Sequence, residues 1–249
     1  MKRFISIMLV LCTLFTMCAL ASCEKKADNK LVVGITEYKP MNYKENGEWT
    51  GFDTEFALAV GKELGLEVEF KVIDWNSKWT ALSSDKIDCV WNGMTITDEA
   101  KQNASVTDAY IINAQVVVMK SDKVADYTDA ASMKDLEFAV ESASAGQEVA
   151  EANEFNFTEY TAMSDALLAV NTGKADACII DITMATSMTG EGTDYADLAA
   201  GIALKEEEYG IAFRKDSDLT KKVNKIIKEM KEDGSLQKLA DKYELTLAD

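Results

Sequence analysis

A stretch near the middle of the chain, residues 88–102, has residue types and a spacing that could bind a small polar ligand. Ile87 and the apolar residues up to Trp91 predict a short buried strand, and Asn92–Gly93 predicts a turn. Thr97, followed by two acidic residues, predicts the start of a helix. A strand end that meets a helix start brings backbone amides, a carbonyl and hydroxyls into one crevice. The stretch therefore indicates a ligand-binding junction, and an ordinary strand-to-helix turn is the alternative.

The composition excludes several kinds of chemistry. The chain has no histidine, so a histidine-dependent triad, a neutral imidazole base and a histidine-ligated metal are all excluded. Its 43 acidic and 26 basic residues give a formal net charge of -17, which argues against binding to nucleic acid or to an anionic membrane surface. With 249 residues, 47% of them hydrophobic, the chain can bury a core, as two modest domains or as one large one. The expected partners are cationic, neutral or zwitterionic.

Residues 1–22 have the features of an export signal. Two basic residues precede an apolar run from Phe4 to Leu20, which ends in Leu-Ala-Ser-Cys and a polar segment. Those last four residues resemble a bacterial lipobox, whose cysteine is acylated and becomes the mature N-terminus. This resemblance predicts lipidation of Cys23, a polar tether at 23–30, and a cell-membrane lipoprotein on the extracytoplasmic face. A transmembrane anchor is the alternative, but it needs about 20 apolar residues and the run falls a little short.

Two cysteines remain once the signal and the lipidation site are set aside. Cys89 and Cys178 each lie in an apolar, strand-like run in a different half of the chain. Each is therefore predicted to be a small buried hydrophobic residue and not half of a disulfide. Because the two are isolated from other ligand types, no metal site is predicted. No cofactor is predicted either.

The order of elements predicts an α/β fold. In the first part, we expect strands at 31–35, 68–72 and 87–91, a helix from residue 53 to 64 closed by a glycine, and a second helix ending near 82. In the second part, we expect strands at 115–119, 138–140 and 175–181, a helix at 162–170, an extended segment at 199–213 and a closing helix at 219–230. Strands that alternate with helices predict βαβ units and a mostly parallel sheet, repeated in a second lobe.

Six motifs resemble, in order and spacing, those of the polar amino-acid-binding proteins of ABC importers, solute-binding protein family 3. They are Gly34–Pro40, Gly51–Asp53, Trp91–Thr97, Gly173–Ala177, Tyr209–Phe213 and Glu232–Leu236. The resemblance covers nearly the whole mature chain. It implies two Rossmann-like α/β lobes of the periplasmic binding protein type II fold, with mixed, mostly parallel sheets joined by a two-segment hinge.

The resemblance also divides the chain and names its partners. It implies that lobe 1 comprises residues 31–111 and 207–249, and lobe 2 residues 112–206, with the ligand between them. It further implies a small-molecule ligand, an amino acid or amine, and an ABC permease in the membrane. The protein is expected to be a monomer with no catalytic residues.

Carried over position by position, the resemblance predicts a ligand site. Tyr38 and Trp75 would flank the ligand side chain, since aromatic faces contribute dispersion and attract a cation by about 0.5 to 2 kcal/mol each; both being core aromatics is the alternative. Asp181 would receive the α-ammonium, together with the Gly93 carbonyl and the Thr95 hydroxyl. The other predicted positions are Asn92 and Met94 beside Gly93, the loop Ser142, Ala143, Ser144 and Ala145 that would close over the carboxylate, and Glu37 and Glu141, which add negative charge near the cleft.

One position departs from the family pattern. The family usually carries an arginine that clamps the α-carboxylate through two parallel hydrogen bonds, and that position is Ala100 here. The chain has two arginines, of which Arg3 leaves with the signal and Arg214 is expected outside the cleft. Lys101 is turned about 100° away on a helix, and an ammonium lacks the planar fork. The sequence therefore predicts a poor site for an α-carboxylate, or a site for a cationic ligand without one.

These observations leave three interpretations open. The first is an extracytoplasmic, lipid-anchored solute-binding protein that captures an amino acid or related amine by lobe closure and delivers it to an ABC importer. The second is a degenerate or ligand-altered receptor of the same fold, which the alanine at position 100 makes a serious alternative. The third is a dehydratase-type enzyme with Glu141 as general acid, which is disfavoured because its substrates carry carboxylates that need strong cationic clamps.

Overall fold

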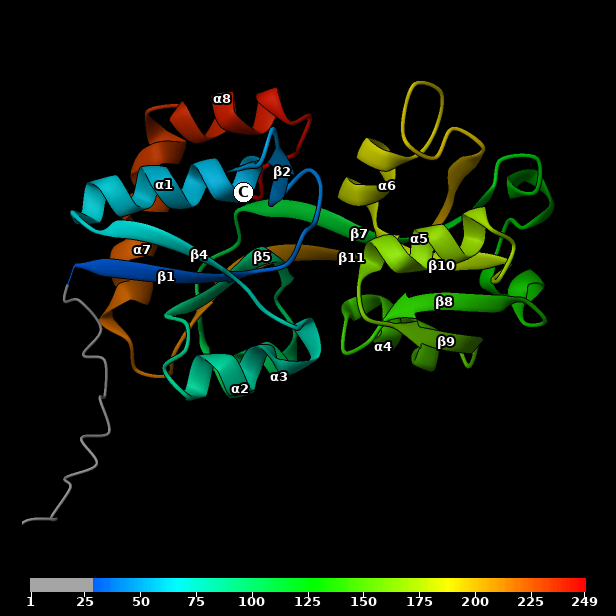
Figure 1. The fold of residues 1–249 in the computed structure, drawn as a ribbon, viewed down its shortest axis with the longest axis horizontal. Coiled ribbons are helices and arrows are strands. Elements are labelled where there is room, and N and C mark those ends of the chain that lie inside the picture. Colours follow the sequence, from blue (N-terminus) through cyan, green and yellow to red (C-terminus); the bar gives the residue numbers. More distant parts are fainter. Residues whose placement is uncertain (1–28) are drawn as a thin grey trace, which may run out of the picture.

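The computed structural model describes residues 29–249, so Cys23 and the predicted signal lie outside the described residues. Two α/β halves lie side by side, and two long strands, β7 (Ile111–Lys120) and β11 (Leu198–Phe213), connect them (Figure 1). This confirms the predicted α/β fold with two lobes and two crossing segments. Within residues 29–249, no helix combines the length and the apolarity that crossing a bilayer requires.

The first half is built on three parallel strands in the order β4, β1, β5. Its elements are β1 (Lys30–Ile35), β2 (Tyr43–Glu45), β3 (Glu48–Thr50), α1 (Phe52–Leu64), β4 (Glu67–Val72), the 3-10 helix η1 (Trp75–Ser77), α2 (Lys78–Ser83), β5 (Cys89–Thr95), α3 (Asp98–Asn103) and β6 (Ser105–Val106). Gly65 takes a left-handed conformation at φ 68° and ends α1 as predicted. Thr97 caps α3, and its hydroxyl accepts a hydrogen bond from the Ala100 amide.

The second half is built on three further parallel strands in the order β10, β8, β9. Its elements are the 3-10 helices η2 (Val124–Asp126) and η3 (Ala130–Met133), β8 (Glu137–Glu141), α4 (Ala145–Ala152), β9 (Asn156–Tyr160), α5 (Met163–Asn171), β10 (Ala177–Asp181) and α6 (Ile182–Met188). After β11 the chain returns to the first half as α7 (Asp218–Glu232) and α8 (Ser235–Lys242), which lie beside α1 (Figure 1). Both C-terminal helices therefore contact the first half of the molecule, and the predicted boundaries of the lobes stay a prediction.

The two halves share one continuous nine-stranded sheet, where two separate sheets were expected. Its main path is β4, β1, β5, β11, β7, β10, β8, β9, and β6 pairs with β11. The sheet is continuous because β7 and β11 pair antiparallel from Leu198 opposite Lys120 to Tyr209 opposite Ile111. The register shifts between Ala200 and Lys205, in the part that belongs to the second half. The parallel strands of each half therefore flank a central antiparallel pair, β7 and β11.

An aromatic core fixes the first half beneath the cleft. Phe56 meets Trp91 edge-on with ring centroids 5.0 Å apart, and Phe52 stacks on Tyr110 at 6.0 Å. Buried Asp53 accepts hydrogen bonds from the Tyr110 hydroxyl at 2.9 Å and from the Gly93 amide at 2.6 Å. Burial raises the pKa of Asp53 to about 7, and these hydrogen bonds lower it in part. The core therefore holds the end of β5 in a defined position.

The two cysteines within residues 29–249 lie in the sheet. Cys89 is buried in β5 and Cys178 is buried in β10, in different halves. Burial raises the pKa of the Cys178 thiol well above its ordinary range. Both positions agree with the predicted role of small buried hydrophobic residues.

Candidate functional site

The end of β5 differs from the sequence expectation. The turn predicted at Asn92–Gly93 is wrong, because β5 continues to Thr95 through pairing with β11. Gly93 has φ 57°, and a Cβ there would lie 2.6 Å from the Tyr38 ring. Glycine is therefore required by both its conformation and the close approach of Tyr38. The irregularity lets the Gly93 amide bond to Asp53 while Asn92, Gly93 and Thr95 line a cavity between the halves.

Two aromatic side chains close this cavity. Tyr38 follows β1, is buried, and places its hydroxyl 2.5 Å from the Thr183 hydroxyl of α6 and 2.6 Å from the Tyr209 hydroxyl of β11. It therefore joins the two halves. Trp75, the first residue of η1, is 8% exposed and lines both this cavity and a neighbouring one.

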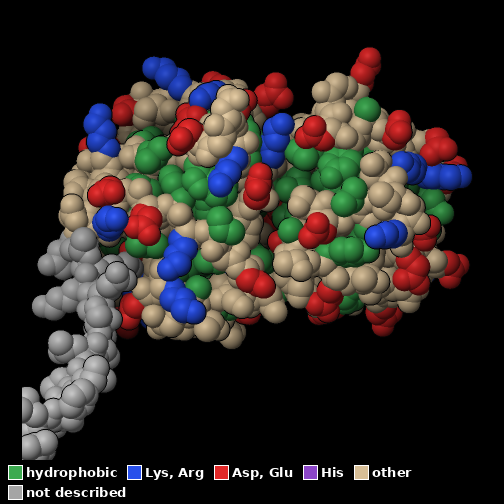
Figure 2. All heavy atoms as spheres, in the orientation of Figure 1, with side chains coloured by type: hydrophobic (Ala, Val, Ile, Leu, Met, Phe, Trp, Pro, Cys, Tyr) green, Lys and Arg blue, Asp and Glu red, His purple; other side chains and the backbone are tan. Residues whose placement is uncertain are grey.

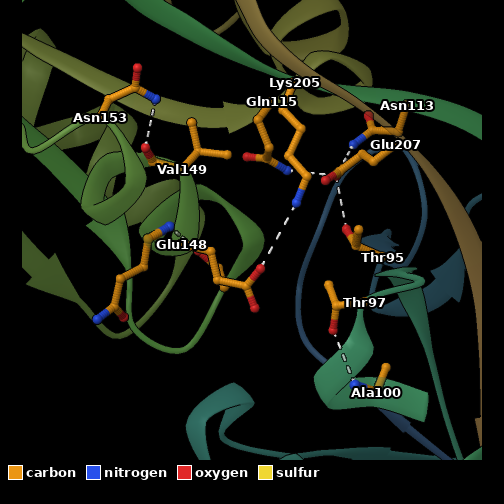
Figure 3. Close-up of polar contacts among 12 residues, drawn as sticks. Thr95, Thr97, Ala100, Asn113, Gln115, Glu148, Val149, Asn153, Lys205 and Glu207 are labelled. Atoms are coloured by element: carbon orange, nitrogen blue, oxygen red, sulfur yellow. Dashed lines mark hydrogen bonds and ion pairs between the residues drawn. The ribbon is translucent and has the colours of Figure 1, made fainter.

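The acidic end of the site lies where the halves meet. Asp181, at the end of β10, accepts hydrogen bonds from the Gln115 amide at 2.9 Å, the Tyr209 hydroxyl at 2.7 Å and the Asn113 amide. The same two amides donate to Glu207 of β11, each at 2.7 Å, and the Thr95 hydroxyl donates to Glu207 at 2.8 Å (Figure 3). Two carboxylates therefore share their donors, and the second oxygen of Glu207 is buried without a partner in the described structure.

The electrostatics of this end favour a cation. Burial raises the pKa of Asp181 well above its ordinary range, and the nearby Glu207 raises it further. Glu141, at the end of β8, is 4% exposed and lines the same cavity as Asp181. Burial raises the pKa of Glu141 to about 8, although Lys78 and the Met163 amide lower it in part. An ammonium or guanidinium group placed here would balance the negative charge that these carboxyl groups carry when they ionise.

The loop before α4 closes the cavities from the second half. Ser144 caps α4 and accepts a hydrogen bond from the Gln147 amide, while Ala145 lines both cavities. Ala143 has φ 57°, and its carbonyl accepts a hydrogen bond from Lys78 at 2.8 Å. Because Lys78 belongs to the first half, this bond crosses between the halves.

Three predicted positions do not line these two cavities. Glu37 is exposed on the loop after β1. Ala100 is 1% exposed, and its methyl group packs in an apolar cluster with Trp75 and Met94. The hydroxyl of Ser142 donates to Glu159 at 2.6 Å. A direct ligand contact for these three stays a prediction, whereas Met94 lines the second cavity beside Thr95.

The structure adds residues that the sequence did not single out. Glu207 is the inward-facing member of a run of three glutamates in β11, in which both neighbours are exposed. That alternation, with a period of two, is a signal that could have identified it. Lys78 lines the second cavity together with Trp79, Thr97, Glu99 and Glu148. Met163 lines the first cavity.

The two cavities adjoin each other and share Trp75, Thr95 and Ala145. Their volumes are about 20 Å³ on the Asp181 side and about 30 Å³ on the Lys78 side, so each has room for about one or two water molecules. A larger cavity of about 220 Å³ lies between α6 and the C-terminal residues, where Glu244 is the one charged residue that lines it. A more open hollow of about 440 Å³ is lined by Thr95, Lys205 and Glu207. The adjoining pair of small cavities combines the Lys78 ammonium with the buried carboxyl groups of Asp181 and Glu141.

The face of the molecule drawn in Figure 2 gives no sign of a polyanion-binding surface. On the face drawn in Figure 2, acidic and basic side chains are interspersed over both halves and form no large basic patch. In the part of the chain that the structure describes, no three metal-ligating side chains lie close enough together to hold a metal ion.

The fold is the two-lobe α/β fold of type II periplasmic binding proteins, with its polar cavities between the lobes. The chain belongs to the bacterial extracellular solute-binding proteins, family 3, whose pattern matches residues 31–246. It is 34% identical to the arginine-binding extracellular protein ArtP of Bacillus subtilis (strain 168), over 98% of both chains.

Solved structures agree. An ancestral arginine-binding protein bound to arginine matches with a TM-score of 0.78 and 32% identity, over 86% of this chain and 98% of that one. An ancestral amino-acid-binding protein, described as a precursor of cyclohexadienyl dehydratase, matches with a TM-score of 0.79 and 31% identity, over 86% of this chain and 95% of that one.

Proposed function

We propose that this protein captures an amino acid between its two lobes outside the cytoplasm and delivers it to an ABC importer. The observation that carries the proposal is the acidic end of the site, where the buried carboxyl groups of Asp181 and Glu141 line one cavity and Glu207 shares the amide donors of Asp181. An α-ammonium group fits this end, because charged hydrogen bonds to a buried carboxylate stabilise a complex by about 1.5 to 3 kcal/mol.

The ligand class is an α-amino acid, with cationic side chains the first to test. Two similarities support this order, since the relative ArtP and the solved ancestral protein are both described as arginine-binding. The formal charge of -17 and the acidic lining of the Asp181 cavity also favour a ligand with positive charge.

Lobe closure is the proposed mechanism. The lobes, 31–111 with 207–249 and 112–206, touch through Tyr38 with Thr183, Lys78 with Ala143, and the Ser187 hydroxyl with the Lys39 carbonyl at 3.1 Å. The cavities between them are too small to admit an amino acid as they stand. The lobes must therefore separate to load the ligand, and a ligand that contacts both lobes favours the closed state.

Membrane attachment through Cys23 is part of the same proposal. Replacing Cys23 with alanine removes the acylation site, so the protein is expected to leave the membrane fraction on cell fractionation. Unchanged retention of the Cys23→Ala protein would contradict the lipid anchor without touching the binding function.

A thermal-shift screen tests the binding function. The mature protein is heated with each proteinogenic amino acid in turn and with a set of polyamines, because a ligand that binds the folded state raises the melting temperature by mass action. At a ligand concentration of about 100 Kd the expected stabilisation is about 2.7 kcal/mol. Asp181→Asn is the matched control and should lose the shift. No stabilisation by any amino acid would overturn the proposal.

A second candidate function rests on Glu141. A carboxyl group with a pKa of about 8 stays protonated at neutral pH, as a general acid must. Incubation with prephenate or arogenate, followed by product analysis, tests a dehydratase. Product that forms with the wild type and not with Glu141→Gln would favour the enzyme, and absence of product leaves the binding function as the better account.

A further inference from the structure

Lys78 is a buried cation at the edge of the ligand site. It is the first residue of α2, and its side chain is 4% exposed because the loop before α4 of the other lobe covers it. Its ammonium donates to the Ala143 carbonyl at 2.8 Å and more weakly to the Trp75 carbonyl at 3.4 Å. It also lies 4.8 Å from the centre of the Trp75 ring and 5.3 Å from that of Trp79.

This cation has no anionic partner in the described structure. No carboxylate oxygen of residues 29–249 lies within 4.0 Å of the Lys78 nitrogen, whose recorded neighbours are the carbonyls of Trp75 and Ala143 and the rings of Trp75 and Trp79. A buried charge without a counter-ion is costly, and proteins normally pair it or leave it exposed. Lys78 therefore needs an anion that the folded chain itself does not supply.

The acidic residues near Lys78 do not fill this role. Glu99 lines the same cavity and raises the pKa of Lys78, but it is exposed in the first turn of α3. The Glu148 carboxylate is directed to Lys205, 3.9 Å away (Figure 3). Glu141 faces the other cavity. Burial dominates, and it lowers the pKa of Lys78 in spite of these three carboxyl groups.

Other hydrogen-bond donors surround the same cavity. Ala145 occupies the first position of the eight-residue helix α4, where the backbone amide has no partner within the helix. The Thr97 hydroxyl accepts from Ala100 and still has its own proton to donate. A cation, a helix amide and a hydroxyl around one space form the donor set that a carboxylate requires.

We propose that Lys78 binds the α-carboxylate of the ligand, in place of the arginine that position 100 lacks. The inference rests on the proposed amino-acid-binding function and deepens it. The carboxylate lies in the Lys78 cavity, the ammonium lies in the adjoining Asp181 cavity, and the α-carbon lies between them, against Trp75 and Thr95. The ligand is therefore an amino acid with a free α-carboxylate and not an amine without one.

The test compares an amino acid with the same molecule after removal of its carboxylate. L-arginine and its decarboxylated form, agmatine, are titrated by calorimetry into the wild type, Lys78→Met and Lys101→Met; if another amino acid gives the largest thermal shift, that acid and its decarboxylated amine replace them. Lys78→Met is expected to weaken L-arginine binding at least tenfold and to leave agmatine binding unchanged or tighter. Lys101→Met, which changes an exposed lysine next to Ala100, should leave the ratio of the two dissociation constants as it is in the wild type.

A rescue variant separates this role from a structural one. Lys78→Met/Ala100→Arg should recover L-arginine binding, because the guanidinium supplies the missing cation to the same space. If Lys78→Met instead weakens both ligands equally, Lys78 only fastens the lobes through Ala143 and the inference is wrong. Equal affinity of Lys78→Met and wild type for L-arginine also overturns it. If no amino acid stabilises the wild type in the thermal-shift screen, the proposed function fails, and not merely the role of Lys78.

Discussion

The two ends of the ligand site differ in how their charged groups are held. At the acidic end, Asp181 and Glu207 lie at the end of β10 and within β11, and amides of β7 hold both of them. At the basic end, Lys78 begins a six-residue helix and is covered by a loop of the opposite lobe. The acidic end is built on the shared sheet, while the basic end depends on the two lobes being in contact.

Under the proposed function, this difference explains how a zwitterion would be selected. Each end has an excess of one charge: carboxyl groups that repel one another on one side, and an ammonium without a counter-ion on the other. A ligand with one charge balances one end only and leaves the other unbalanced. A ligand with both charges at the spacing of an amino acid balances both, so the uncompensated charges themselves give specificity.

The largest expected effect concerns protonation at the acidic end. The folded protein keeps a proton on Glu141 up to a pKa of about 8, whereas the unfolded chain loses it near the ordinary value of 4.5. The folded state therefore binds more protons in this window, and stability falls as the pH rises from about 5 to 8. Between pH 5 and pH 8, the free energy of unfolding of Glu141→Gln should therefore fall by about 3 kcal/mol less than that of the wild type. Urea unfolding at these two pH values measures the difference.

The matched control for this pH experiment lies on the same strand. Glu137 begins β8, is exposed, and should leave the pH dependence unchanged when replaced by glutamine. Asp53, with a pKa of about 7, contributes to the pH dependence of stability in every variant. An unchanged slope in Glu141→Gln would mean that Glu141 ionises normally and that the acidic end carries more negative charge than we infer.

The next effect separates affinity from stability. Asp181→Asn should weaken binding of the best amino acid by about 1.5 to 3 kcal/mol, because the ammonium loses its charged acceptor. The ligand-free protein should not be destabilised, since the repulsion between Asp181 and Glu207 is relieved. Calorimetry and thermal unfolding measure the two quantities, and Asp197→Asn, at an exposed aspartate of the same lobe, serves as control. Destabilisation without loss of affinity would assign Asp181 to the core alone.

A smaller effect should be equal for ligands with and without a carboxylate. Trp75 lines both cavities, so Trp75→Ala is expected to cost about 1 to 2 kcal/mol of binding for an amino acid and for its decarboxylated amine. This equal loss is the opposite of the selective loss expected from Lys78→Met. If Trp75→Ala lowers the melting temperature but leaves the affinity per folded molecule intact, Trp75 is a core residue and not a wall of the site.

The smallest effect adds a second cation to the basic end. With Lys78 in place, Ala100→Arg should tighten binding of a carboxylate ligand by about 1 kcal/mol, since one cation is already present. The same change should weaken an amine without a carboxylate, because a like charge is added beside it. No change in the affinity for either ligand would show that position 100 does not face the ligand.

The sequence predicts the parts of the site that depend on nearby residues, and it misses the parts that depend on residues far apart in the chain. Gly93 and Thr95 are predicted because one motif contains both, and Asp181 is predicted because the resemblance carries it over by position. The helix cap at Thr97 is local chemistry. The turn at Asn92–Gly93 was wrong because pairing with β11, more than 100 residues away, extends β5 beyond the local turn signal.

Lys78 and Glu207 were missed for related reasons. Lys78 begins a short helix, a position typical of a surface lysine, and a loop of the other lobe completes its burial. Glu207 lies in a run of three glutamates, and such a run is typical of a solvent-exposed segment. Its inward position follows only if the alternation of side chains between the two faces of a strand is considered. Residues whose environment is created by the contact between lobes are not visible in the local pattern of either lobe.

The continuous sheet also determines what hydrogen exchange will detect under the proposed lobe closure. Glu206 to Tyr209 of β11 stay paired with β7 at the point where the lobes join, and the irregular registers lie to either side. A rotation of one lobe can therefore be accommodated by twisting at those irregular positions while the central ladder remains intact. Amides of this ladder will exchange slowly with or without ligand, and the change on binding will be concentrated at Lys78, Ala143 and the loop that carries it.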